Sequence, residues 1–166
     1  MVAGYATYSN GCMVRTTLLY WFTGIIFLLA LAPVLLSVAS RFQKPLLGMR
    51  AGRLLPCPAR PNCVCSEEPG KASGVAPLPF SGKSDRAWAR AVWSVQQMGG
   101  QVLREENGYL HAVFRSRFYR FIDDLELRLD REQRVIHLRS AARAGSSDFG
   151  VNRKRAEEMQ ALFQAS

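Results

Sequence analysis

Residues 121–140 read FIDDLELRLDREQRVIHLRS, and this stretch decides the fold. Apolar and polar residues alternate through 121–129 and again through 134–140, which is the pattern of two half-buried strands. The polar residues 130–133 lie between them and favour a turn. The stretch therefore predicts an antiparallel hairpin with one apolar face and one charged face.

A second hairpin precedes this one. Residues 101–106 and 109–115 alternate in the same way and flank Asn107-Gly108, which is a strong signal for a two-residue turn. Together the two hairpins predict a small antiparallel sheet of about four strands.

Two amphipathic helices are expected to flank the sheet. The first begins at Ser84 and Asp85, whose side chains can cap it, and ends at Gly99-Gly100. The second runs from about residue 152 to 163. The predicted fold class is α+β, with two helices beside the sheet and an N-terminal apolar membrane segment before it.

That apolar segment covers residues 18–38 and is long enough to span a bilayer. It also resembles a cleaved signal peptide, because Pro33 would end its helix and Ser37-Val38-Ala39 supply the small residues that signal peptidase requires. Met13 is a more natural start for such a signal than Met1. Both interpretations, signal peptide and transmembrane anchor, stay open.

The chain divides into three parts: residues 1–40 as signal or anchor, 41–56 as a basic linker, and 57–166 as a single α+β domain. The full chain has a formal net charge of +9, but the domain has 17 Lys and Arg against 13 Asp and Glu and is only mildly basic. The basic stretch 139–155 contains a single aromatic residue, Phe149, and lacks the interleaved aromatic residues of a single-strand platform, so a nucleic-acid partner is not expected.

Three cysteines lie in a proline-rich loop, at Cys57, Cys63 and Cys65. A disulfide between Cys57 and Cys63 would close this loop and would require an oxidising compartment. Three thiolates can instead bind zinc or copper(I), but no second cysteine pair or nearby histidine completes such a site. Four basic residues after the apolar segment favour a cytoplasmic domain. The signal and the cysteines instead favour an extracytoplasmic domain. We expect the extracytoplasmic location, in the periplasm or on the cell membrane.

Strand parity places His111, Asp124, Glu126, His137 and Arg139 on one outer, solvated face of the sheet. Pairing of position 129 with 134 would set Glu126 opposite His137 and Asp124 opposite Arg139, with His111 beside Glu126. Two histidines and a carboxylate on adjacent strands can bind a transition metal. The alternative, which we favour, is simple cross-strand charge pairing.

A cation-rich loop and helix start follow, in LRSAARAGSSDFGVNRKRAE at 138–157. If Asn152 caps the last helix, Arg153 and the next two basic residues occupy its first turn, where the helix dipole disfavours cations. An anion resolves this conflict, because it would accept hydrogen bonds from free backbone amides and from arginine. That anion is either the protein's own Asp148 or Asp123, or a ligand.

Asp123 points toward the core by parity and therefore needs a cationic partner. We predict that Asp123, Arg143, Asp148 and Arg153 form one cluster at the amino end of the last helix. The candidate ligand-binding residues are Arg139, Arg143, Asp148, Asn152, Arg153, Asp123, Asp124 and Glu126.

Three motifs, CPARPNCVCS, FRSRFYRFIDDLELRLD and IHLRSAARAGSSDFGVNRKRAE, resemble, in order, those of the domain of unknown function family 1499. The resemblance covers roughly residue 54 to the carboxyl terminus. It implies a bacterial or plastid protein, usually behind a signal or membrane anchor, and it implies no established reaction, ligand or cofactor. The chain departs from the family pattern at Cys65 and Ala142, where serine is usual, at Ser146, where a larger residue is usual, and in lacking a histidine before Pro77.

These observations predict an extracytoplasmic or membrane-anchored domain with an Arg-rich site that is an anion-binding site or a structural ion-pair site. The alternative is a hydrolase acting on an anionic cell-envelope compound. No catalytic triad, Walker loop or nucleotide fingerprint supports an enzyme, and no cofactor is expected. Expected partners are the membrane and a small anionic ligand, and the sequence leaves the oligomeric state and any catalytic residue open.

Overall fold

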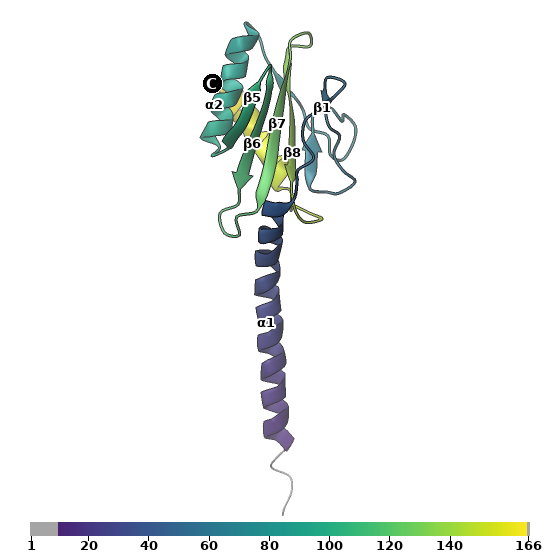
Figure 1. Ribbon diagram of the computed structural model, residues 1–166, viewed down its shortest axis with the longest axis vertical. Coiled ribbons are helices and arrows are strands. Elements are labelled where there is room, and N and C mark those ends of the chain that lie inside the picture. Colours follow the sequence, from purple (N-terminus) through teal and green to yellow (C-terminus); the bar gives the residue numbers. More distant parts are fainter. Residues whose placement is uncertain (1–9, 166) are drawn as a thin grey trace, which may run out of the picture. The chain divides into compact units, whose positions relative to one another are not determined.

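The computed structural model describes residues 10–165 (Figure 1), with side chains from residue 15 onward. The expectation about a start at Met1 or Met13 lies outside these described side chains. The chain divides into two compact units, residues 1–35 and 36–166. The helices are α1 (Asn10–Phe42), α2 (Ser84–Gln97) and α3 (Val151–Ala165).

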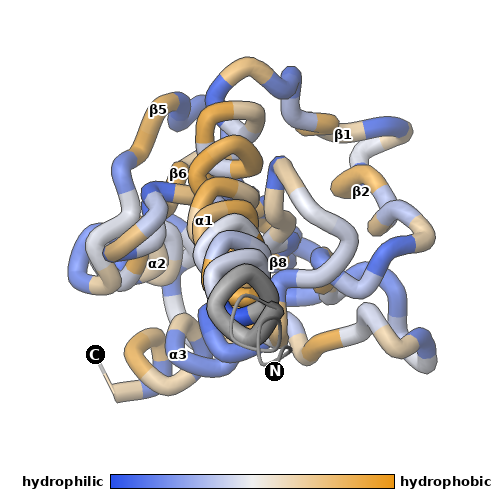
Figure 2. The backbone as a smooth tube through the Cα atoms, turned by 90° about the horizontal axis from the view of Figure 1, so that it is seen from below, coloured by the Kyte–Doolittle hydropathy of each residue, from blue (hydrophilic) through white to orange (hydrophobic). Residues whose placement is uncertain are grey.

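Helix α1 contains the apolar segment, and hydrophobic residues follow one another through it (Figure 2). Among the described residues, Arg15–Phe42 is the one helical stretch long and apolar enough to cross a membrane, by length and composition. Such a helix is compatible with an anchor and with a signal. The expected end of the helix at Pro33 is wrong, because α1 continues through this proline to Phe42. Proline removes one backbone donor, which a long apolar helix can tolerate.

The main sheet has six strands and is antiparallel, so the expected sheet of about four strands is too small. The four longest strands are the predicted ones: β5 (Gln101–Glu106), β6 (Tyr109–Arg115), β7 (Ile122–Asp130) and β8 (Val135–Ala142). The additional strands are β3 (Cys63–Cys65) and β4 (Leu78–Pro79), which both pair with β8. A separate two-stranded sheet consists of β1 (Met49–Arg50) and β2 (Arg53–Leu54).

The strand order β3-β8-β7-β6-β5 places β7 and β8 in the middle of the sheet (Figure 1). The turn at Asn107-Gly108 has positive φ at both residues, 49° and 76°, as a tight hairpin turn of this kind requires. Because β7 and β8 each have a neighbour on both sides, side chains at their centres are covered most completely.

The apolar face of the sheet packs against α2 and α3. Leu125, Leu127 and Leu138 on this face are fully buried, together with Val95 of α2 and Met159 of α3. The capping position of α2 is occupied by Lys83, and its side chain makes no capping hydrogen bond. The expected capping by Ser84 and Asp85 is therefore not seen. The alternation in the sequence thus correctly predicts which face forms the main core.

The opposite face is also covered, and the expectation that it is solvated is wrong. Residues 44–68, which include the segment predicted as a linker, lie across it. Leu54 packs there against Tyr109 and Cys65 in a second small hydrophobic cluster. We call residues 44–68 the cover segment. Under this cover the charged residues of β6, β7 and β8 are buried, and they form the candidate site.

Candidate functional site

The register between β7 and β8 differs from the predicted one by two residues. Glu126 lies opposite Arg139, and His137 lies opposite Arg128. The predicted neighbours His111 and Glu126 are indeed opposite each other on β6 and β7. A slip of two residues keeps every side chain on its face, which is why the parity argument still places these residues together.

Glu126 is fully buried at the centre of the polar face and accepts three hydrogen bonds. Its donors are Arg139 Nη1 at 2.7 Å, the Tyr109 hydroxyl at 2.7 Å and the Gly48 backbone N–H at 2.6 Å, the last from the cover segment. Burial and the hydrogen bond to Glu126 together raise the pKa of Tyr109, so its hydroxyl stays a donor at neutral pH. A carboxylate with three donors satisfies the requirement for a buried charge.

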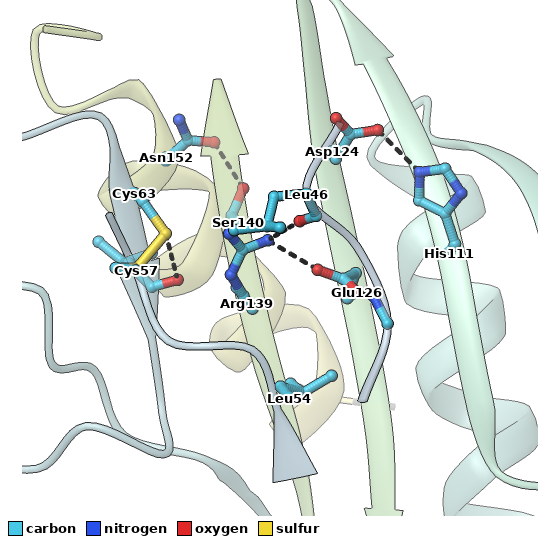
Figure 3. A network of polar contacts seen from close by, with 12 residues as sticks. Leu46, Leu54, Cys57, Cys63, His111, Asp124, Glu126, Arg139, Ser140 and Asn152 are labelled. Carbon is cyan, nitrogen blue, oxygen red and sulfur yellow. Dashed lines mark hydrogen bonds and ion pairs between the residues drawn. A yellow bond between two sulfur atoms is a disulfide. The ribbon is translucent and has the colours of Figure 1, made fainter. Parts of the chain in front are cut away.

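The Oε1 atom of Glu126 accepts from Tyr109 and Gly48, and its Oε2 atom accepts from Arg139. Figure 3 shows Arg139 on β8 pointing toward Glu126 on β7. The same Nη1 of Arg139 also donates to the Leu46 carbonyl of the cover segment at 3.1 Å. The Arg139–Glu126 pair therefore holds the cover segment against the sheet through two backbone groups.

Arg139 also has an unsatisfied donor. Its side chain is 3% exposed, and its Nε is buried with no hydrogen-bond partner within the described part of the chain. Leaving a buried donor unpaired costs about 1–3 kcal/mol, and more when the group is charged. The Nε–H group of Arg139 therefore still has a hydrogen bond to donate.

Asp124 lies one pleat further along the same face and is bound by an arginine and a histidine. Arg143 donates to it through Nε at 2.8 Å and Nη2 at 2.7 Å, and His111 Nε2 lies 2.7 Å from its Oδ1 (Figure 3 shows the histidine contact). Burial acts to raise the pKa of Asp124, but the hydrogen bonds from Arg143 and His111 outweigh it and lower that pKa. Asp124 is therefore ionised at neutral pH.

The two histidines share the buried polar face but have different partners. His111 contacts Asp124, whereas His137 Nδ1 lies 3.1 Å from the Ser66 hydroxyl of the cover segment. Among the described residues, no group of three or more His, Cys, Asp or Glu side chains is arranged to hold a metal ion.

Asp123 faces the helices, as parity predicts, but its partner is Arg155 and not Arg143 or Arg153. Arg155 Nη2 donates to Asp123 Oδ2 at 2.8 Å, and the guanidinium lies 4.6 Å from the centre of the Phe114 ring. Burial raises the pKa of Asp123, although Arg155 partly offsets this effect. The ion pair is thus an internal link between β7 and α3.

The start of α3 also differs from the prediction. Asp148, not Asn152, caps it, because the Asp148 carboxylate accepts from the backbone N–H groups of Gly150 at 3.1 Å and Asn152 at 2.8 Å. Asn152 is fully buried instead, accepting from the Ser140 hydroxyl at 2.6 Å and donating to the Asn62 carbonyl at 3.1 Å. Asp148 therefore supplies an anionic group at this helix end.

Arg153 contacts backbone carbonyls, whereas Asp123 is paired with Arg155. It donates to the carbonyls of Ala72 and Gly74, at 2.6 Å and 3.2 Å. The predicted cluster of Asp123, Arg143, Asp148 and Arg153 is therefore wrong. Arg143 belongs to the polar face with Asp124, Asp123 pairs with Arg155, and Asp148 and Arg153 line a separate cavity.

That separate cavity, of about 700 Å³, lies beside the disulfide loop. The predicted bond between Cys57 and Cys63 is present, whereas Cys65 is a free, buried thiol whose pKa is raised by burial. The cavity wall carries both signs of charge, including Glu68 and Arg153. Glu68 is bound by Lys71, Ser73 and a backbone amide.

A smaller cavity, of about 260 Å³, lies where the cover segment meets β7 and β8, and we call it the Arg139 cavity. Its charged lining residues are Lys44, Arg60, Asp124, Arg139 and Arg143. Asp124 and Arg143 neutralise each other, and Arg139 is paired with Glu126, whereas Lys44 and Arg60 form no salt bridge within the described residues. The cavity therefore has an excess of positive charge.

Sequence reasoning missed three contributors to these sites, namely Lys44, Arg60 and Arg155. Lys44 was counted as part of a linker, and Arg60 lies in a loop without periodicity. Arg155 carried a usable signal, because it follows Asn152 by three residues and so lies one helical turn further along the same side of α3.

No curated protein matches the chain. A family model described as "Protein of unknown function (DUF1499)" matches residues 53–163, a range that contains the disulfide loop, the ion pairs of Arg139, Arg143 and Arg155, and all six strands of the main sheet. Because this match covers more than half of the chain, and the resemblance of its motifs points the same way, the chain belongs to the DUF1499 family.

Proposed function

We propose that this chain is an extracytoplasmic, membrane-attached domain that binds a small carboxylate or phosphate anion in the Arg139 cavity. The observation that carries the proposal is the buried Nε of Arg139, which has no partner among the described residues while the side chain lines a cavity. A ligand oxygen at this position would pair with that donor, and Lys44 and Arg60 would add charge at the cavity wall.

The geometry around the cavity supports a preformed anion site. Asp124 fixes Arg143 through two hydrogen bonds, and Glu126 fixes Arg139, so both guanidinium groups are held before a ligand arrives. Prior fixing lowers the conformational entropy lost on binding. The volume of about 260 Å³ suits a small anion better than a polymer.

Attachment and location rest on two further observations. The apolar helix over Arg15–Phe42 supports contact with a membrane, either as an anchor or before signal cleavage. The disulfide between Cys57 and Cys63 supports an oxidising, extracytoplasmic compartment. The proposal includes no nucleic-acid partner and no cofactor.

The lowered pKa of Asp124 supports binding over hydrolysis at this cavity. A general acid must hold a proton near neutral pH. Asp124 is the one carboxyl side chain among the residues that line the cavity, and its pKa is shifted in the opposite direction. Binding is therefore our first proposal, and hydrolysis of an anionic cell-envelope compound stays the alternative.

Thermal unfolding of the full chain in mild detergent tests the proposal, with inorganic phosphate or succinate added against sodium chloride of equal ionic strength. A bound anion at a concentration a hundredfold above its dissociation constant stabilises the fold by about 2.7 kcal/mol. Lys44→Gln/Arg60→Gln should lose most of this gain and keep its stability in chloride, because both side chains are exposed.

The matched control is Lys83→Gln/Arg86→Gln, which removes the same charge from exposed positions at the start of α2. This control should keep the full response to the anion. Equal responses of both double variants, or a parent protein that responds to chloride as strongly as to phosphate and succinate, would contradict a specific site in the Arg139 cavity.

A further inference from the structure

One end of the sheet exposes large aromatic side chains. Phe118 lies in the loop 116–121 between β6 and β7 and is 85% exposed, and Phe149 lies in the loop 143–150 after β8 and is 93% exposed. The two loops adjoin, because the Arg143 backbone N–H donates to the Ile122 carbonyl at 3.1 Å. Two nearly uncovered aromatic rings at one end of a domain indicate a contact surface.

Three arginines surround a cavity of about 350 Å³ at the same end, together with Ile122. They are Arg41, Arg115 and Arg120. Within residues 15–165 none of the three forms a salt bridge with a carboxylate, and Arg115 donates to the neutral Gln101 amide oxygen at 2.7 Å. The cavity therefore has three cationic groups without counter-ions among the described side chains.

The loop 116–121 is hydrogen-bonded to the last turns of α1. The Ser37 hydroxyl donates to the Tyr119 carbonyl, and both Ser37 and Ser40 are buried. A bilayer core needs about 20 apolar residues in a helix. Counting from Leu18, such a span ends near Ser37, which is the residue that contacts the loop 116–121.

We propose that this end of the domain lies on the bilayer surface, where Phe118 enters the boundary between headgroups and acyl chains. The phosphate of an anionic phospholipid would then occupy the cavity between Arg41, Arg115 and Arg120. This inference rests on the membrane attachment in the proposed function and is independent of the anion in the Arg139 cavity.

The sequence of the loop fits a lipid surface better than a protein partner. Residues 115–121 read RSRFYRF, in which arginines alternate with aromatic residues. Aromatic side chains favour the membrane interface, and basic side chains near an anionic leaflet are attracted to it. Arg117 adds a further cation beside the Phe118 ring, at 5.9 Å from its centre.

Tryptophan fluorescence of the full chain in vesicles tests the insertion of Phe118. Phe118→Trp is compared with the parent protein in vesicles that contain acyl-chain-brominated phosphatidylcholine and phosphatidylglycerol, since bromine quenches nearby indole. The native Trp21, Trp88 and Trp93 give the background to subtract. The control is Gln133→Trp, in the turn at the other end of β7, about 30 Å away for a nine-residue strand.

We expect strong quenching of the added indole in Phe118→Trp and little in Gln133→Trp. Quenching of Trp21 in the parent separately reports whether α1 enters the bilayer. If Trp21 is not quenched, the membrane attachment of the proposed function fails. If Trp21 is quenched while the indoles at 118 and 133 are quenched equally, the surface inference alone is overturned.

A second pair of variants tests the phosphate in the cavity, in the background of Phe118→Trp. Arg115→Gln/Arg120→Gln should remove the increase in quenching that phosphatidylglycerol causes over pure phosphatidylcholine. The matched control, Arg131→Gln/Arg134→Gln, should keep it, and Arg134 resembles Arg120 in having a positive φ, 55° against 59°. An unchanged effect of phosphatidylglycerol in the first variant would overturn a lipid phosphate in the cavity.

Discussion

Asp123 and Asp124 are neighbours in β7 with opposite environments, and this contrast predicts opposite pH effects of their removal. Asp124→Asn removes the negative charge that contacts Arg143 and His111, whereas Asp123→Asn removes the one that contacts Arg155. Asparagine keeps the size of aspartate, so the two variants change charge and hydrogen bonding more than packing.

The expected cost of Asp124→Asn follows from its contacts. The Asp124 side chain is 3% exposed and accepts two hydrogen bonds from Arg143. Removing one member of a buried ion pair costs about 3–5 kcal/mol. The Asn amide oxygen still accepts one of these bonds, so we expect a loss of about 3 kcal/mol in the free energy of unfolding at neutral pH.

The sign of the pH dependence follows from the direction of each pKa shift. The pKa of Asp124 is lowered in the folded state, so its stabilising contribution is present above the ordinary aspartate pKa of about 4 and is lost as pH falls through the lowered value. The pKa of Asp123 is raised by burial, so its contribution is most favourable below about 4 and is lost as pH rises through the raised value.

Urea unfolding of the full chain in mild detergent, followed by tryptophan fluorescence from pH 3 to pH 7, measures both effects. The cost of Asp124→Asn should grow as pH rises, and the cost of Asp123→Asn should shrink over the same change. Glu132→Gln, in the exposed turn before β8, is the control and should show neither trend. If both aspartate variants change in the same direction, the assignment of two opposed environments is refuted.

Two further predictions concern the links that hold the cover segment. Glu126→Gln removes the charge that pairs with Arg139, so we expect the free energy of unfolding in urea to fall by about 3 kcal/mol. Hydrogen exchange at the Gly48 amide should become faster, and an unchanged exchange rate would contradict its bond to Glu126. Cys57→Ser/Cys63→Ser opens a short loop and should lower the free energy of unfolding by about 2 kcal/mol in the same assay. The parent protein treated with a reductant should lose as much stability. Equal stability of the oxidised and reduced parent would refute a stabilising role of the disulfide.

Strand alternation was the most informative part of the sequence. It placed Leu125 and Leu127 in the main core and Asp124 and Glu126 on the opposite face, and both placements are confirmed. It could not fix the register, because a slip of two residues leaves every side chain on the same face. The turn actually covers 131–134, where positive φ at Arg134 moves the first paired residue of β8 to Val135.

The cover segment was missed for a different reason. Its contacts with Glu126 and Arg139 are made by the backbone N–H of Gly48 and the carbonyl of Leu46, and backbone groups leave no mark in the pattern of residue types. Its strands β1 and β2 have two residues each, which is too short for alternation to be recognised. The expected solvation of the polar face followed directly from this omission.

The contacts of Gly48 and Leu46 also affect where a recombinant fragment of this protein should begin. The family match starts at residue 53, after both of these residues. A fragment that starts there would keep Glu126 and Arg139 but remove two of the backbone groups that satisfy them. The shortest fragment that preserves the buried polar face therefore starts upstream of the family boundary, before Leu46, and Lys44 must be retained if the wall of the Arg139 cavity is to be complete.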